Sequence, residues 1–202
     1  FSKIGAGSIF ETLRPAGLPV RLWVLTGSLV VVPTQSVPML SEIMKRYSFA
    51  ADHFQFQPLE IDASYSRIEV AAESRQNVVK LITQLLSAGG ITVLIGTKSL
   101  LGEGWDEPSV NTLILASFAG TFMLTNQMRG RAVRVQPGNS QKTANIWHLV
   151  CVESDNTAGV DYVTVVGRFK TFVGISSQNN RIENGIGRLS IENPPFSRSR
   201  II

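Results

Sequence analysis

Three arginines lie within six residues of the segment that reads NQMRGRAVR. Arg129, Arg131 and Arg134 stay charged at physiological pH, and the planar guanidinium group suits the oxygens of a phosphate. On a helix, Gln127, Arg131 and Arg134 have the spacing i, i+4 and i+7 and share one face, whereas Arg129 points elsewhere. Gly130 beside them lets a ligand or a partner backbone come close. We interpret this face as an anion-binding surface, and a solvated cationic face is the alternative that the spacing leaves open.

A second group of polar residues follows the apolar segment ITVLI, in the loop that reads GTKSLLGEGWDEPSVN. Thr97 and Ser99 offer hydroxyl and N–H groups, and Gly104 permits close backbone approach. Asp106 offers a carboxylate to the hydroxyls of a ribose or to an arginine. Trp105 could stack on a base, and its other interpretation, which we favour, is an anchor in the core. An ordinary loop after a strand is the alternative for the whole group.

Both groups depend on an alternation of strands and helices. Apolar periodicity predicts a helix over residues 73–88, which Gly89 and Gly90 end. Continuous apolar runs predict strands over residues 91–97, 111–117 and 143–152, with a helix over residues 120–134 that carries the arginines. This order predicts an α/β fold with a mostly parallel sheet covered on both faces. Ligands of such sheets bind beyond the carboxyl ends of the strands, where both groups begin.

The N-terminal part continues the same domain. Residues 20–33 read as a strand with a bend at Thr26-Gly27-Ser28, and residues 36–49 read as a helix with Ser36 as a candidate cap. After Val152 the composition becomes polar. We therefore place one domain at residues 1–152 and an extension or linker towards a further domain at residues 153–202.

The composition is that of a globular chain with a mild excess of positive charge. Among 202 residues, 19 are Lys or Arg and 15 are Asp or Glu, and 44% are hydrophobic. The net charge of +4 permits a polyanionic partner without requiring one. Cys151 is the one cysteine, which excludes an internal disulfide and suits a reducing cytosol. No run approaches the roughly 20 apolar residues of a membrane span. The first residue is not Met, and we read the chain as part of a longer or processed protein.

The loop GTKSLLGEGWDEPSVNTLILAS and the segment TNQMRGRAVR resemble motifs V and VI of superfamily 2 helicases. The resemblance is closest to the bacterial DEAD/DEAH-box branch that includes the helicase subunits of restriction enzymes. Motif VI of that family reads Q-x-x-G-R-x-x-R, and motif V has a Thr after a strand followed by Gly-x-Asp. The matching residues are Gln127, Gly130, Arg131 and Arg134 for motif VI, and Thr97, Gly104 and Asp106 for motif V.

The resemblance implies a second, C-terminal RecA-like domain, which is a three-layer sandwich around a mostly parallel sheet. Arg131 and Arg134 would be arginine fingers that stabilise the phosphates of ATP across a gap between two domains. The triphosphate would then be the counter-charge that the arginines lack nearby. The nucleotide-binding residues would be Gln127, Gly130, Gly104 and Asp106, and those that bind nucleic acid would be Thr97, Lys98 and Ser99.

The phosphate- and metal-binding motifs of the family are missing from this chain. The loop is not a G-x-x-x-x-G-K-[ST] motif, because Thr97 rather than Gly precedes Lys98. The Asp-Glu motif that binds Mg²⁺ belongs to the first domain of the family and has no counterpart here, since the adjacent Asp106 and Glu107 fall in the loop that resembles motif V. ATP and Mg²⁺ would therefore bind mainly to a first RecA-like domain of the same parent protein, and we expect this chain alone to be inactive as an ATPase.

The sequence thus predicts the second motor domain of an ATP-dependent helicase or translocase that acts on DNA or RNA in the bacterial cytoplasm, with no membrane partner and no metal site of its own. The alternative is a non-catalytic clamp or scaffold that binds nucleic acid and retains the helicase fold. A Walker A loop and an Asp-Glu pair upstream would favour the motor.

Overall fold

The structure is a computed structural model that describes residues 5–97, 105–116, 122–152, 158–191 and 194–196. The chain divides into two compact units. The N-terminal unit comprises Phe1–Leu113 and Ala119–Ile146, and the C-terminal unit comprises Ile114–Phe118 and Trp147–Ile202. The boundary near residue 153 that the composition suggests stays a prediction.

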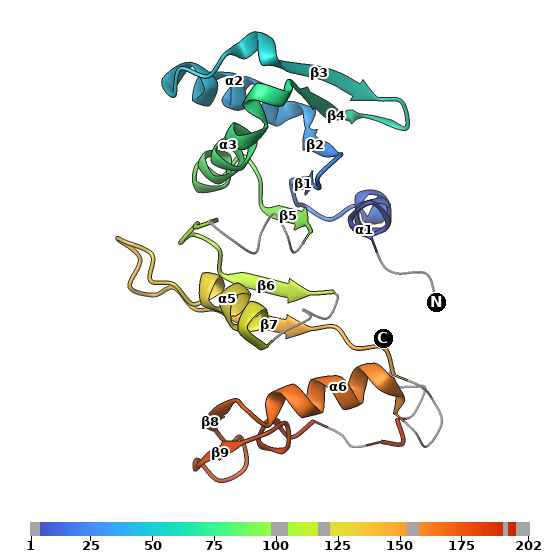
Figure 1. The fold of residues 1–202 in the computed structure, drawn as a ribbon, viewed down its shortest axis with the longest axis vertical. Coiled ribbons are helices and arrows are strands. Elements are labelled where there is room, and N and C mark those ends of the chain that lie inside the picture. The colour runs from blue at the N-terminus through green and yellow to red at the C-terminus, as the bar shows by residue number, and fades with distance from the viewer. Residues whose placement is uncertain (1–4, 98–104, 117–121, 153–157, 192–193, 197–202) are drawn as a thin grey trace. The chain divides into compact units, whose positions relative to one another are not determined.

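The N-terminal unit contains a five-stranded mixed sheet in the order β3-β4-β2-β1-β5 (Figure 1). Its strands are β1 (Leu22–Leu25), β2 (Val30–Pro33), β3 (Phe54–Leu59), β4 (Asp62–Val70) and β5 (Val93–Gly96). β1 and β5 run parallel, so that Leu22 pairs with Val93 and Leu25 with Gly96. The pairs β1–β2, β2–β4 and β3–β4 are antiparallel.

The predicted α/β class is confirmed, but this sheet is more antiparallel than the apolar runs suggested. The reason lies in the turn after β1. Thr26 donates its backbone N–H to the carbonyl of Leu29 at 2.8 Å, and its hydroxyl oxygen accepts the N–H of Leu29 at 2.9 Å. The expected bend at Thr26-Gly27-Ser28 is therefore a complete hairpin turn, and the predicted single strand is an antiparallel pair.

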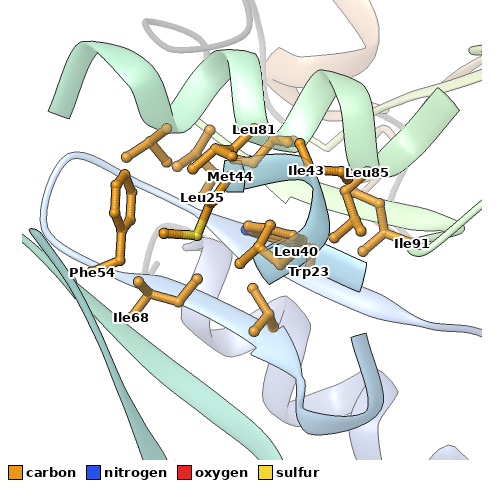
Figure 2. Packing of buried hydrophobic residues seen from close by; sticks show 13 residues of the cluster. Trp23, Leu25, Leu40, Ile43, Met44, Phe54, Ile68, Leu81, Leu85 and Ile91 are labelled. Carbon is orange, nitrogen blue, oxygen red and sulfur yellow. The ribbon is translucent and has the colours of Figure 1, made fainter. Parts of the chain in front are cut away.

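Two helices cover one face of this sheet. They are α2 (Val37–Arg46) and α3 (Arg75–Ser87), which matches the periodicity of both segments. Figure 2 shows their apolar side chains meeting those of the sheet around Trp23. The buried members of this cluster are Trp23, Leu25, Val32, Leu40, Ile43, Met44, Phe54, Ile68, Val78, Leu81, Ile82, Leu85 and Ile91. Each such aliphatic side chain contributes about 1.5–3 kcal/mol when it leaves water.

The opposite face of the sheet packs against α1 (Ala6–Leu13). Leu22 and Val24 alternate with Trp23 and Leu25 along β1, so they point to this second face and contact a cluster around Phe10. At the end of α1, Arg14 pairs with Glu11 at 2.9 Å and with Asp62 of β4 at 3.1 Å.

Ser36 has a different role from the predicted cap. It occupies the position before α2, but its side chain makes no capping hydrogen bond. Instead, the buried hydroxyl donates to the carbonyl of Gly90 at 2.7 Å, which joins the start of α2 to the end of α3. A partner 54 residues away cannot be read from local sequence.

The next elements follow the loop that contains Trp105 and Asp106. β6 (Thr112–Leu115) and β7 (Asn145–His148) form a two-stranded sheet, and α5 (Phe122–Ala132) lies between them in sequence. The N–H groups of Asn145 and Leu149 donate to the carbonyls of Asn111 and Leu115, at 2.8 and 3.0 Å. Both residue numbers rise together, as in a parallel pair.

The C-terminal unit includes α6 (Gly159–Phe169) and a hairpin of β8 (Val173–Ile175) and β9 (Ile182–Asn184). Phe169 contacts the rings of His148 and Phe172 edge to face. Short 3₁₀ turns complete the described chain at Arg14–Ala16, Thr34–Ser36, Ala51–His53, Ala72–Ser74 and Gly187–Leu189. Within the described residues, no helix is both long and apolar enough to cross a bilayer.

Gly90 is expected to tolerate no side chain. A Cβ there would lie 2.4 Å from Cδ1 of Leu85 and 2.8 Å from Sδ of Met39. We predict that Gly90→Ala lowers the free energy of unfolding by about 1–3 kcal/mol, because the core must shift to admit a methyl group. Gly7→Ala in α1 is the control, since nothing lies within 4 Å of its Cβ position. Equal urea midpoints for the two variants would contradict the prediction.

Candidate functional site

Trp105 anchors the loop that precedes β6. Its side chain is only 7% exposed, and its indole N–H donates to the hydroxyl of Thr83 on α3 at 3.0 Å. The favoured interpretation of Trp105 as a core anchor is therefore confirmed. The anchor fixes this part of the loop to a helix whose other face belongs to the main core.

Glu107 gives the loop a second buried attachment, which the sequence analysis missed. One carboxylate oxygen accepts the hydroxyl of Ser87 at the end of α3, and the other accepts the N–H of Ser109 at 2.9 Å. The side chain is 5% exposed. Local sequence gives no signal for this attachment, because Ser87 lies 20 residues before Glu107.

Asp106 lies between these two attachments and faces solvent. Its carboxylate forms an ion pair with the guanidinium of Arg134, and both side chains are about half exposed. Sequence reasoning left Asp106 open to a ribose or to an arginine, and its partner in the structure is Arg134. The expected shortage of acids beside the arginines is therefore wrong for Arg134, and a pair with a carboxylate of its own chain is the opposite of what the finger assignment predicts for this residue.

Arg131 lies in the last turn of α5 and contacts the anchor itself. The central carbon of its guanidinium is 6.0 Å from the centre of the Trp105 ring, a cation–π distance. Burial lowers the pKa of Arg131, repulsion from Arg134 lowers it further, and Asp106 offsets part of the effect. An anion that approached Arg131 would favour the charged form of the guanidinium and so offset these two effects on its pKa.

Arg134 lies beyond the helix, in contrast to the predicted helix of residues 120–134. α5 ends at Ala132, so the expected face of i, i+4 and i+7 holds for Gln127 and Arg131 but not for Arg134. The ion pair with Asp106 nevertheless places Arg134 and Arg131 around the same loop. A Cβ at Gly130 would meet nothing within 4 Å, which agrees with a surface open to close approach.

Lys142 connects the backbone segments on either side of the Asp106–Arg134 pair. Its ammonium group donates to the carbonyl of Arg134 at 2.7 Å and to that of Pro108 at 2.6 Å. The lysine thereby joins the segment after α5 to the segment after Asp106. A single lysine in a polar turn carries no local signal for such a bridge, so sequence analysis did not find it.

The other predicted site residues are placed only in part. Thr97 directly follows β5, at its carboxyl end, and is half-buried. Gln127 is exposed on α5. Lys98, Ser99 and Gly104 lie outside the described residues. Among the residues that are described, no cluster of three or more His, Cys, Asp or Glu side chains has the arrangement of a metal site.

The Asp106–Arg134 pair is expected to contribute little to folding, because both groups are half exposed. A double-mutant cycle with Asp106→Asn and Arg134→Gln should give a coupling free energy below about 1 kcal/mol in urea unfolding. Glu107→Ala is the contrasting control and should lower stability by about 1–3 kcal/mol, since it removes a buried hydrogen-bonding partner. A coupling larger than the Glu107 effect would make the pair structural.

Comparison with known proteins adds no relative to this description. No protein-family model matches the chain, and no curated protein or solved structure is significantly similar to it. The likeness to helicase motifs V and VI therefore remains a resemblance of two short segments.

Proposed function

We propose that the chain is the second, RecA-like motor domain of an ATP-dependent nucleic-acid helicase or translocase. In this role Arg131 and Arg134 act on the phosphates of ATP, and the polar residues after β5 contact the backbone of DNA or RNA. ATP and Mg²⁺ bind mainly to a first RecA-like domain of the parent protein. The resemblance also favours a bacterial cytoplasmic enzyme of restriction-modification type.

One observation carries the proposal, namely the convergence of the two motif-like segments. They are separated by β6, yet Arg134 pairs with Asp106 and Arg131 stands over Trp105. A chance match of two motifs would not require their residues to touch. The parallel pairing of β1 with β5, which delivers Thr97 to a carboxyl edge, is further support for the RecA-like arrangement.

The chemistry asked of the arginines is electrostatic. Phosphoryl transfer develops negative charge on the transferred group, and a positioned guanidinium stabilises that charge by roughly 10³–10⁵ in rate. Arg131 is held by the helix and by the Trp105 ring. Arg134 lies outside the helix and must leave Asp106 to reach a phosphate, which releases the carboxylate to accept a ribose hydroxyl.

A non-catalytic clamp is the second candidate, and the same ion pair favours it. If the charge of Arg134 stays balanced by Asp106, the arginine stabilises the loop and never meets a nucleotide. Such a protein would bind nucleic acid without any nucleic-acid-stimulated ATPase activity. The two candidates therefore differ in one measurable property: a motor hydrolyses ATP faster when nucleic acid is bound, and a clamp does not.

In a parent protein that carries the P-loop domain, Arg131→Ala should reduce nucleic-acid-stimulated ATP turnover by about 10³-fold or more. Arg129→Ala is the matched control, because Arg129 lies on the same helix but about 160° around it and off the proposed face. Steady-state phosphate release measures the rate, and thermal unfolding checks the fold of both variants. An unchanged rate for Arg131→Ala, or equal losses for both variants, would remove the finger assignment.

Thr97→Ala should weaken binding of the parent to a single-stranded oligonucleotide by about 2- to 10-fold, the worth of one hydrogen bond to a phosphate. ADP affinity should not change. Thr164→Ala in α6 provides the control, since its hydroxyl bonds only to the local carbonyl of Val160 among the interactions described. Fluorescence anisotropy measures both affinities, and a normal oligonucleotide affinity for Thr97→Ala would contradict its role.

A further inference from the structure

A half-open hollow of about 240 Å³ lies beside the candidate site, within the N-terminal unit. The end of α2, the middle of α3 and the anchored loop surround it. Its principal lining residues are Tyr47, Phe49, Lys80, Gln84, Trp105 and Asp106. The hollow borders both the core and the arginines, because Phe49 packs against the main core, Trp105 contacts Arg131, and Asp106 pairs with Arg134.

The aromatic side of the hollow is already ordered for stacking. The rings of Tyr47 and Phe49 lie 6.0 Å apart at an angle of 19°. The hydroxyl of Tyr47 donates to the side-chain carbonyl of Gln84 on α3 at 2.8 Å, which fixes the ring against the helix. Tyr47 is nevertheless 46% exposed, so part of this aromatic side chain is accessible to a ligand. Planar heterocycles bind such surfaces by stacking.

The chemical groups at the hollow suit those of a nucleotide. The lining includes aromatic rings and the carboxylate of Asp106, which pairs with Arg134, and the guanidinium of Arg131 lies over the Trp105 ring that also lines the hollow. A nucleotide presents a flat base, ribose hydroxyls and phosphates. The hollow is smaller than the roughly 300–1,000 Å³ of a complete ligand pocket, so it suits one ring system and not a whole nucleotide.

We propose that this hollow binds the base of the nucleotide whose phosphates meet Arg131 and Arg134. The inference rests on the proposed function and extends it, because it assigns base recognition to this domain. Tyr47 supplies the stacking surface, Gln84 holds the ring of Tyr47 in place, and Asp106 lies where the ribose passes from the hollow to the arginines. The base thus contributes affinity that is independent of the phosphate contacts.

Saturation-transfer NMR of the 202-residue chain tests this with adenosine, ADP and pyrophosphate as probes at millimolar concentration. The H2 and H8 protons of adenosine and ADP should receive the strongest saturation, because the base enters the hollow. ³¹P line broadening follows pyrophosphate, which has no base. ADP should bind more tightly than pyrophosphate by about fivefold or more, which corresponds to the lower limit of the free energy of one base–aromatic stack.

Tyr47→Leu keeps an apolar side chain of similar bulk and removes the aromatic face. It should abolish the advantage of ADP over pyrophosphate and leave the affinity for pyrophosphate unchanged. Tyr47→Phe should retain the advantage, since it keeps the ring. Tyr162→Leu is the control, because Tyr162 contacts Phe196 in the C-terminal unit. Thermal unfolding confirms that each variant is folded.

The outcomes separate this inference from the proposed function. If Arg131→Ala weakens pyrophosphate binding but Tyr47→Leu leaves ADP binding intact, the base site is wrong and the arginine assignment survives. If Tyr47→Leu weakens an oligonucleotide and not ADP, the hollow takes a base of nucleic acid and the inference is overturned. Absence of any base saturation with adenosine or ADP also overturns it, whereas ATP turnover in the parent protein still tests the arginines.

Discussion

The hydrogen bond from the indole of Trp105 to Thr83 is the contact on which the candidate site depends. Together with the buried carboxylate of Glu107, it fastens the loop to α3 on both sides of one exposed residue. Asp106, between these two buried residues, is exposed to solvent at a position that the two attachments fix. Since the inner face of α3 is part of the main core, the position of the carboxylate is set by the same apolar contacts that stabilise the sheet.

The two arginines around this loop are held in different ways. Arg131 sits on the last turn of a helix, partly desolvated against an aromatic ring. Arg134 is outside the helix and more exposed, and a lysine fixes its backbone while its side chain pairs with a neighbouring acid. One guanidinium is therefore fixed in orientation by its surroundings, and the other is held by a single half-exposed ion pair. Under the proposed function, the first cation would be placed in advance and the second would adjust to the ligand.

Local sequence predicted the elements whose patterns are strong and missed those that depend on distant partners. The helix predicted over residues 73–88 and the strand predicted over residues 91–97 correspond to α3 and β5, each with slightly narrower bounds. The direction of the strands could not be predicted from the sequence, because a short apolar run is compatible with both a parallel and an antiparallel sheet. The mixed polar and apolar sequence of Asp62–Val70 did not indicate a strand, although these residues form β4. No residue type at positions 133–134 indicated that α5 ends at Ala132. The bridge made by Lys142 joins two segments that only the fold brings together.

The internal pairing of Arg134 has a consequence for how ionic strength acts on this site. When Arg134 leaves Asp106 for an external anion, one pair of opposite charges replaces another. Dissolved ions screen the two pairs to a similar degree, so the net effect on the exchange is small. Under the proposed function, nucleotide affinity that depends only weakly on salt would be compatible with full engagement of Arg134. The slope of affinity against salt concentration would then undercount the charges that meet the phosphates.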